Sequence, residues 1–217
     1  MWLLILALVG TGCGLGSPSS DSSTSGGSIS SNGGASPSGG LDYETAFQAK
    51  GGHLWTVGSD QHGDWGFPLA PGTSPSIAPT SKGYGGLDYE TAFQAANGHL
   101  WTVGSDPHGD WGFALAPGTS PSITSTPTGY RGIGYEVAFR AKDGHLWTVG
   151  SDPHGDWGFT LAPGTSPSIA STPRLYGGIR YEVAFRAKDG HLWTVGSDQH
   201  GDWGFRLASG SSPSIAR

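Results

Sequence analysis

The segment GSDPHGDWGF occupies Gly104–Phe113 and returns unchanged at Gly150–Phe159. With Gln in place of Pro it occurs twice more, at Gly58–Phe67 and Gly196–Phe205. Each copy begins 46 residues after the previous one, with no insertion or deletion between copies. A fixed period of about 40 to 50 residues is typical of propellers and solenoids, in which each repeat forms one supersecondary unit. The fold therefore depends on what one copy forms and on how four copies join.

Within one copy, large apolar residues alternate with small or polar ones. YEVAFRA, which begins at Tyr135, has the period of two that is typical of a strand. HLWTVG from His145 predicts a second strand and WGFTLA from Trp157 a third, with a turn at Lys142-Asp143-Gly144. SPSIA, which begins at Ser166, predicts a short fourth strand. Four short antiparallel strands per repeat are typical of a propeller blade.

The two ends of the repeat region predict a closed ring. The first copy begins at Leu41-Asp42-Tyr43 with no SPSIA before it, whereas the chain ends with SPSIA at Ser212–Ala216. If the last segment joins the first copy, no sheet edge stays exposed. We therefore expect an all-β fold, a four-bladed β-propeller formed by residues 41–217. A larger propeller built from two chains and an open β-solenoid are the alternatives.

Composition agrees with a β-rich fold and argues against nucleic-acid binding. The chain of 217 residues contains 39 Gly and nine Trp, a mixture that favours strands and turns over helices. Only 13% of the residues are charged and the net charge is −6, so we expect no basic surface for nucleic acid.

The N-terminus predicts export. Trp2–Val9 is an apolar run too short to span a membrane as a helix, but suited to a secretory signal. Small residues then lead to Cys13, the only cysteine. This resembles a bacterial lipobox, although the segment before the apolar run has no Lys or Arg. We expect residues 1–13 to be a signal with lipidation at Cys13, and a plain secretory signal is the alternative.

Residues 14–40 are rich in Ser and Gly and offer almost no apolar surface to bury. They predict a disordered linker that holds the folded part away from a membrane. The expected location is therefore the bacterial cell surface, with membrane contact only through the lipid. Secretion is the alternative.

Most large side chains at repeated strand positions are expected to form the core. In the third copy these are Tyr135, Val137, Phe139, Leu146, Val149, Phe159, Leu161 and Ile169. Ala138, Gly150 and Gly158 are small, and we expect them to let neighbouring sheets approach closely.

The loop SDPHGD has three interpretations. Asp106, His108 and Asp110 alternate like metal ligands, but three ligands are fewer than a zinc or calcium site needs. Catalysis requires groups that converge on one place, whereas these residues recur in four places. In the third interpretation the loop is a hairpin corner, in which Asp106 bonds to amides two residues on, Gly109 has a positive φ and Trp111 lies under the turn. The corner is loosely similar to the Asp-box of sialidases. We favour it, and expect no cofactor, no metal and no enzyme activity.

The residues that a corner does not require predict carbohydrate binding. A flat Trp face stacks on a sugar ring, while carboxylates and imidazoles bond its hydroxyls. Four equivalent weak sites that face a surface with many glycans would multiply the effective affinity of the protein through avidity. The predicted binding set is Trp55, Asp60, His62, Asp64, Trp101, Asp106, His108, Asp110, Trp147, Asp152, His154, Asp156, Trp193, Asp198, His200 and Asp202.

Two further sets of residues are weaker candidates. Tyr84, Tyr130 and Tyr176 lie in the connections between copies. Glu44, Glu90, Glu136 and Glu182 are expected either to line one mouth of a channel or to form structural hydrogen bonds.

The repeat also resembles a known family. The matching residues are Ser166-Pro167, Ala184-Phe185-Arg186, Asp189, Leu192-Trp193 and Trp203. They look like the blade repeat of the PLL/tectonin-type bacterial β-propeller lectins, over residues 41–217. The resemblance implies binding of fucose or related glycans in clefts between blades. Members of that family usually have more blades, and their loops differ from SDPHGD, so the identity of the sugar does not carry over.

Two functions follow as hypotheses. The first is a surface-tethered, multivalent carbohydrate-binding protein without catalytic activity, present as a monomer or a homodimer, with glycans as partners. The alternative is a protein-interaction scaffold of the cell envelope. A glycosidase would need an asymmetric cluster of carboxylates, and no copy contains one.

Overall fold

The computed structural model describes residues 43–217 apart from 60, 61, 82, 107, 153, 177 and 199, and apart from the side chains of 174–176. The predicted signal, Cys13, the linker and Asp60 lie outside the described residues. Within the described part, the chain forms strands and two short 3-10 turns and no α-helix, which confirms the all-β prediction.

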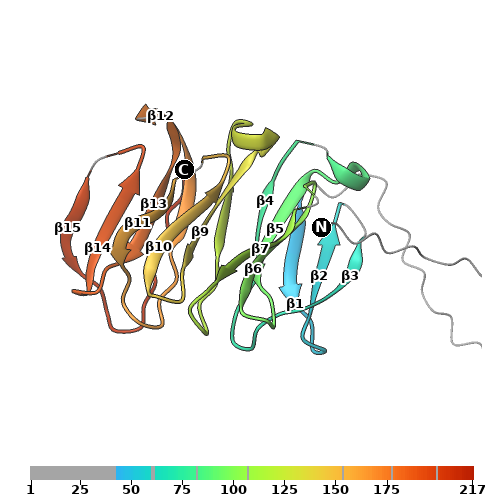
Figure 1. The fold of residues 1–217 in the computed structure, drawn as a ribbon, viewed down its shortest axis with the longest axis horizontal. Coiled ribbons are helices and arrows are strands. Elements are labelled where there is room, and N and C mark those ends of the chain that lie inside the picture. The colour runs from blue at the N-terminus through green and yellow to red at the C-terminus, as the bar shows by residue number, and fades with distance from the viewer. Residues whose placement is uncertain are drawn as a thin grey trace, which may run out of the picture. The chain divides into compact units, whose positions relative to one another are not determined.

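Fifteen strands form four antiparallel sheets that follow one another in sequence order (Figure 1). The first sheet contains β1 (Glu44–Gln48), β2 (His53–Gly58) and β3 (Gly63–Pro68). The second contains β4 (Ser76–Pro79), β5 (Tyr89–Gln94), β6 (His99–Gly104) and β7 (Gly109–Ala114). The third contains β8 (Ser122–Ser125), β9 (Tyr135–Arg140), β10 (His145–Gly150) and β11 (Gly155–Thr160). The fourth contains β12 (Ser168–Tyr176), β13 (Ile179–Arg186), β14 (His191–Gly196) and β15 (Gly201–Arg206). The turns are η1 (Tyr84–Gly86) and η2 (Tyr130–Gly132).

The register of the sheets repeats with the sequence. In the third sheet Ile123 of β8 lies opposite Val137 of β9, and Val137 lies opposite Val149 of β10. The SPSIA strand of one copy thus pairs with the first long strand of the next copy, as the sequence predicts. The pairing of β10 with β11 shifts between His145 and Trp147, and a bulge of this kind increases the local twist.

The core lies between successive sheets, so both faces of the middle sheets are buried. Phe159 of the third sheet packs on Phe185 and Trp193 of the fourth, with ring centroids 5.9 and 5.4 Å apart. In β9 the small or polar Glu136 and Ala138 are buried as fully as Val137. In this strand, residues that alternate between large and small or polar therefore point to two faces that are both packed against neighbouring sheets.

Two of the small residues have different structural roles. A Cβ on Gly150 would lie 2.3 Å from the carbonyl oxygen of Tyr135, so this glycine permits close contact with the neighbouring strand of its own sheet. A Cβ on Gly158 would meet nothing within 4 Å, but φ is +72°. The prediction that these two glycines let neighbouring sheets approach is therefore wrong: Gly150 allows a close contact within its own sheet, and the backbone conformation of Gly158 is the reason for glycine there.

Hydrogen bonds between sheets recur at the repeat spacing. The N–H of Ser120 donates to Oγ of Ser166 and the N–H of Ser166 donates to Oγ of Ser212, each at 2.9 Å and each across 46 residues. The N–H of Ile169 donates to Oγ of Ser122, and the N–H of Ile215 donates to Oγ of Ser168, both at 3.2 Å. The SPSIA segments therefore lie side by side, and the last of them continues the row.

The described residues do not show the predicted closure within one chain. β1 is an edge strand, and residues 211–217 belong to no strand. The first and fourth sheets lie at opposite ends of the row in Figure 1. The four repeated antiparallel sheets are thus confirmed, and closure of the ring stays a prediction.

Candidate functional site

Asp106 lies at the boundary between the second and third sheets. Its Oδ2 accepts a hydrogen bond from the Tyr135 hydroxyl at 2.8 Å, and its N–H donates to Oε2 of Glu90 at 2.8 Å. Burial raises the pKa of the Tyr135 phenol, so it stays a neutral donor. The predicted hydrogen bond from a backbone amide two residues later is made by Asp110 and not by Asp106. The N–H of Gly112 donates to Oδ1 of Asp110 at 2.7 Å. The corner prediction is right about Gly109, whose φ is +78°, but wrong about which Asp caps the turn.

A polar pocket lies beside Asp106, and an equivalent one lies beside Asp152. The Asp106 pocket measures about 200 Å³ and is lined also by Ser105, Arg131 and Tyr135. The Asp152 pocket measures about 190 Å³ and is lined also by Ser151, Arg180 and Tyr181. Each pocket thus combines a carboxylate, a serine, a tyrosine and an arginine at the boundary between two sheets. The carboxylate, serine and tyrosine are repeat equivalents, whereas Arg180 stands at the repeat position of Gly134 and not of Arg131.

The histidine of each SDPHGD loop stacks on the tryptophan three residues later. His108 and Trp111 have ring centroids 3.7 Å apart and planes only 7° from parallel. The other three copies have the same stack at 3.5 to 3.6 Å, between His62 and Trp65, His154 and Trp157, and His200 and Trp203. The indole N–H of Trp111 donates to Oγ1 of Thr102 at 2.9 Å, which fixes the orientation of the ring.

An open groove joins one of these stacks to the neighbouring sheet. We call it the His108 groove. It measures about 350 Å³ and is lined by His108, Trp111, Phe113, Tyr130, Arg131 and Asp152, among others. Arg131 also lines the Asp106 pocket and Asp152 also lines the Asp152 pocket, so the groove shares one lining residue with each of them. Aromatic faces and charged groups therefore lie together along this boundary.

The tryptophans of the predicted binding set lie elsewhere. Trp147 packs between Phe113 and Phe139, with centroid distances of 5.4 and 6.5 Å, and lines a separate groove with Lys142 and Asp143. Trp101 makes the corresponding contacts with Phe67 and Phe93. The indole nitrogens of Trp101, Trp147 and Trp193 are buried and have no hydrogen-bond partner among the described residues. These rings are half-buried parts of the sheet boundaries.

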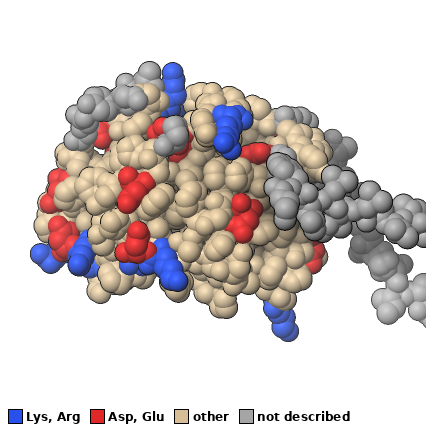
Figure 2. All heavy atoms as spheres, viewed as in Figure 1, with Lys and Arg blue, Asp and Glu red and all other residues tan. Residues whose placement is uncertain are grey.

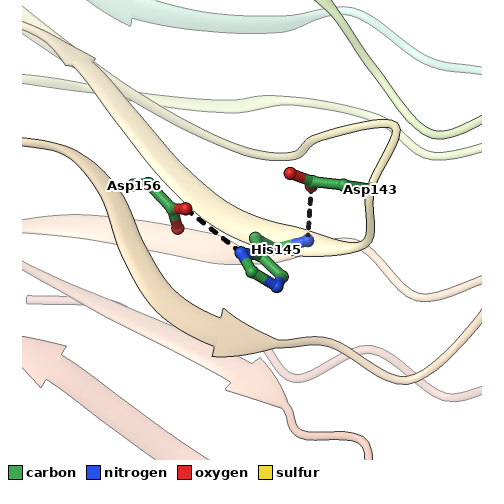
Figure 3. Close-up of side chains that lie close together, drawn as sticks. All are labelled: Asp143, His145 and Asp156. Carbon is green, nitrogen blue, oxygen red and sulfur yellow. Dashed lines mark hydrogen bonds and ion pairs between the residues drawn. The ribbon is translucent and has the colours of Figure 1, made fainter.

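The second carboxylate of each loop pairs with a histidine from the preceding strand. Nδ1 of His145 lies 3.1 Å from Oδ2 of Asp156, and the His145 N–H donates to Oδ1 of Asp143 at 3.0 Å (Figure 3). The Gly158 N–H lowers the pKa of Asp156, desolvation opposes this, and His145 lowers it further. The bond to Asp156 raises the pKa of His145. His53, His99 and His191 make the equivalent pairs with Asp64, Asp110 and Asp202.

The same side chains form two possible metal clusters. Asp143, His145 and Asp156 each offer one ligand atom within 4.8 Å of the others, as do Asp189, His191 and Asp202. Three exposed ligands are fewer than a structural zinc site has, and Nδ1 of His145 already bonds Asp156. The geometry of these clusters fits surface hydrogen-bonded pairs better than metal sites.

The repeated glutamates are structural. Oε2 of Glu136 accepts bonds from the Ser151 hydroxyl at 3.1 Å and from the Asp152 N–H at 2.9 Å. Burial raises the pKa of Glu90 and of Glu136 to about 8, and raises that of Glu182 as well. Of the two roles considered for these residues, the contacts favour the hydrogen bond that holds the loop.

The four repeat positions of the predicted binding set do not converge on one place. Asp106 and Asp152 line polar pockets, His108 lines a groove with Trp111, Trp147 lines another groove, and Asp156 pairs with His145. His62, His154 and His200 share the stacked position of His108, and Asp198 follows the pattern of Asp106 in donating its N–H to a glutamate, Glu182.

Sequence reasoning missed Trp111 and Arg131 as site residues. The His-x-x-Trp spacing was visible, but a strand does not by itself predict that these two rings stack. Arg131 has φ +56°, an uncommon conformation for a residue other than glycine, and Gly85 is its equivalent in the first connection. The signal that could have identified Arg131 is a charged residue at a position where the first connection has glycine.

The charged side chains are scattered over the face shown in Figure 2. Acidic and basic groups lie among a large area of uncharged residues on that face. In the described part of the chain, no helix has the length and apolar character needed to cross a membrane. Comparison of the chain with protein-family models and with curated proteins finds no match.

Proposed function

We propose that this protein is a multivalent carbohydrate-binding protein without catalytic activity, tethered to the bacterial cell surface through Cys13. The sugars would bind at the boundaries between sheets. The observation that carries the proposal is the recurrence of one polar pocket at Asp106 and at Asp152, with a neighbouring aromatic groove. A repeated site on a rigid array is the arrangement that makes weak binding effective through avidity.

The chemistry of the pockets supports a sugar as ligand. A carboxylate and a guanidinium bond the hydroxyls of a pyranose from fixed directions, and Arg131 stands beside Asp106 in this way. In the His108 groove, the His108–Trp111 stack, Phe113 and Tyr130 provide an aromatic lining for the C–H side of a sugar ring. Because Arg131 lines both the Asp106 pocket and the His108 groove, a glycan of more than one residue is favoured over a single monosaccharide.

The arrangement of the site argues against an enzyme. Glycosidases hold two carboxylates on either side of a bond, about 5 to 10 Å apart and in one place. Here the carboxylate of Asp106 bonds a tyrosine of the next sheet, and that of Asp156 bonds an exposed histidine. Neither arrangement is aimed at a shared substrate position.

The finer architecture, a closed β-propeller, is part of the proposal. Each of the last three sheets receives its SPSIA strand from the preceding copy, whereas β1 has none. Addition of a Ser212–Ala216 segment to β1, from the same chain or from a second copy, would complete the first sheet and remove the exposed edge.

The first experiment is a glycan array followed by isothermal titration with the glycans that bind. We expect binding of several glycans per chain and a micromolar to millimolar dissociation constant for each site, as for other shallow sugar sites. Asp152→Asn is expected to weaken binding about tenfold or more, because an amide replaces the charged acceptor. The Tyr181 hydroxyl, which donates to Asp152 at 3.0 Å, still finds an acceptor in the amide oxygen.

Asp143→Asn is the matched control, since Asn97 already stands at the equivalent position of the second copy. It should leave sugar binding unchanged. Arg131→Gly, which copies Gly85, removes the guanidinium without backbone strain and should weaken binding at the boundary between the second and third sheets. An array without any signal would contradict the proposal and favour the protein-interaction scaffold.

A further inference from the structure

We infer that two copies of this chain join head to tail, the C-terminal segment Ser212–Ala216 of each adding a strand to β1 of the other. The fourth sheet of each copy would then pack on the first sheet of its partner. Two such contacts close the assembly into a ring of eight sheets, the largest number in the usual range of about four to eight blades. The inference does not depend on carbohydrate binding.

The first observation is an empty place for a strand beside β1. A cavity of about 570 Å³ lies there, lined by Tyr43 and Glu44 of the first sheet and by Ile77, Ala78 and Pro79 of β4, among others. In the second and third sheets the corresponding place, next to the SPSIA strand of the sheet that follows, is filled by β4 and by β8. The cavity therefore has the position of the missing inner strand.

The second observation is that the C-terminal segment already lies in the row of inner strands. The N–H of Ile215 donates to Oγ of Ser168, as the N–H of Ile169 donates to Oγ of Ser122. Ser212 accepts from the N–H of Ser166 in the same register. The segment is thus placed as the inner strand of a fifth sheet, and no such sheet exists in the chain that the structure describes.

The third observation concerns the two end faces, which are the outer face of the first sheet and the outer face of the fourth sheet. Residues that are buried where two successive sheets meet are exposed on these two faces. Phe205 of β15 is 65% exposed, whereas its counterpart Phe159 packs on Phe185 and Trp193. On the first sheet Phe47 is 38% exposed, whereas Phe93, Phe139 and Phe185 are fully buried. Tyr43 is 62% exposed against 1 to 2% for Tyr89, Tyr135 and Tyr181. Exposed aromatic faces of this kind mark an interaction surface.

The partner must be a second copy, because the two end faces of one chain lie at opposite ends of the row in Figure 1. The C-terminal segment is bonded to β12 of the fourth sheet, while the cavity beside β1 borders β4 of the second sheet. Only another chain brings an identical segment to that cavity without a change in the packing of the sheets. A contact between two different faces is heterologous. It forms a closed ring when the rotation that relates the two copies also brings the free face of the second copy onto the free face of the first.

The repeat fixes the register of the proposed contact. Ile77, Ile123 and Ile169 lie opposite Thr91, Val137 and Val183 respectively, so Ile215 should lie opposite Thr45 of the partner subunit. By the same pattern, Phe205 should pack between Phe47 and Trp55 of the partner subunit, as Phe159 packs on Phe185 and Trp193.

Disulfide trapping tests this register. Thr45→Cys and Ile215→Cys are made separately in the full-length chain carrying Cys13→Ser, and the two variants are mixed and oxidised with diamide. Directly opposed strand residues have Cα atoms close enough for a disulfide. We expect the mixture to give a covalent dimer on a non-reducing gel, and each variant alone to give none. The absence of a mixed dimer would overturn the inference.

The chain carrying both cysteines separates the two ways of closing the ring. It should form a covalent dimer, and light scattering of the unoxidised chain should give twice the mass of one chain. A double variant that crosslinks only within itself, at the mass of one chain, would show closure as four blades and overturn the inference. A mass of three or more chains would also overturn it.

A surface substitution provides an independent test. Phe205→Glu puts a charge on the proposed contact but on no buried position of its own chain, so the far-ultraviolet spectrum should not change. It is expected to halve the mass measured by light scattering. Lys142→Glu, which changes an exposed residue in the turn between β9 and β10 of the third sheet, is the control and should keep the doubled mass. If the unchanged protein forms the dimer but binds no glycan on the array, the proposed function is wrong and the dimer inference stands.

Discussion

The hydroxyl of Tyr135 donates a 2.8 Å hydrogen bond to the carboxylate of Asp106 across the boundary between the second and third sheets. The same hydroxyl lies 3.2 Å from Oγ1 of Thr102, which also accepts the indole N–H of Trp111. One buried phenol thereby links the loop, the preceding sheet and the surface stack. Tyr181 repeats the arrangement with Asp152 and Thr148 one boundary further on.

Removal of this hydroxyl should destabilise the protein. Tyr135→Phe leaves Asp106 without its donor and takes a partner from Thr102, so we expect a loss of about 1–3 kcal/mol in the free energy of unfolding. Urea unfolding followed by tryptophan fluorescence measures it. Tyr84→Phe deletes a hydroxyl from a side chain that is 70% exposed, and should change the stability by less than about 0.5 kcal/mol. Equal losses in the two variants would contradict the role of the bond.

The buried glutamates should make stability depend on pH. Burial raises the pKa of Glu136 from 4.5 to about 8, so between these values the unfolded chain has released a proton that the folded chain retains. The free energy of unfolding should therefore fall as the pH rises through this range. Glu136→Gln removes one of these titrations and should make the fall shallower in urea unfolding measured at several pH values. An unchanged slope would show that the carboxyl is ionised in the folded protein.

The exposed His145–Asp156 pair should shift a titration with little effect on stability. The bond to Asp156 raises the pKa of His145, so any stabilisation is present at pH below the ordinary value and is lost as the pH rises through the raised one. NMR titration of Asp156→Asn should return the pKa of His145 toward its ordinary value, while the free energy of unfolding changes by less than about 1 kcal/mol. The amide can still accept the N–H of Gly158, which donates to Oδ1 of Asp156 at 2.8 Å.

Two glycine substitutions should differ in size for separate physical reasons. Gly158→Ala meets no atom but forces an alanine to φ +72°, and should cost about 1–2 kcal/mol. Gly150→Ala puts a Cβ 2.3 Å from the backbone oxygen of Tyr135, so strands must separate and the loss should be larger. Thermal unfolding of the two variants compares them directly. A larger loss for Gly158→Ala would contradict the assignment of the close strand contact to Gly150.

The sheets were predictable because each signal is local or periodic. Alternation from Tyr135 to Arg140 and the turn at Gly144 define a hairpin without knowledge of its neighbours, and the constant spacing places all four copies. The site was less predictable. Asp106 and Asp110 are both acidic residues of one short loop, and the loop alone does not tell which of them binds Tyr135, 29 residues after Asp106 and in another sheet.

The same limit applies to the tryptophans and to the ends of the array. Trp101 and Trp111 both occupy strands, and only the positions of Phe67 and His108 show that Trp101 packs on the preceding sheet while Trp111 carries the histidine stack. The sequence of Ser212–Ala216 matches an inner strand, but its phase is the same whichever chain provides β1.

The serine-to-backbone bonds at 46-residue intervals bear on how such a gene can evolve. Because the chain atoms that meet are the same at each junction, unequal crossing-over between two copies would delete or insert one whole unit and still leave well-matched neighbours. The number of sheets in the protein is therefore open to change by simple duplication, without any new packing between neighbours.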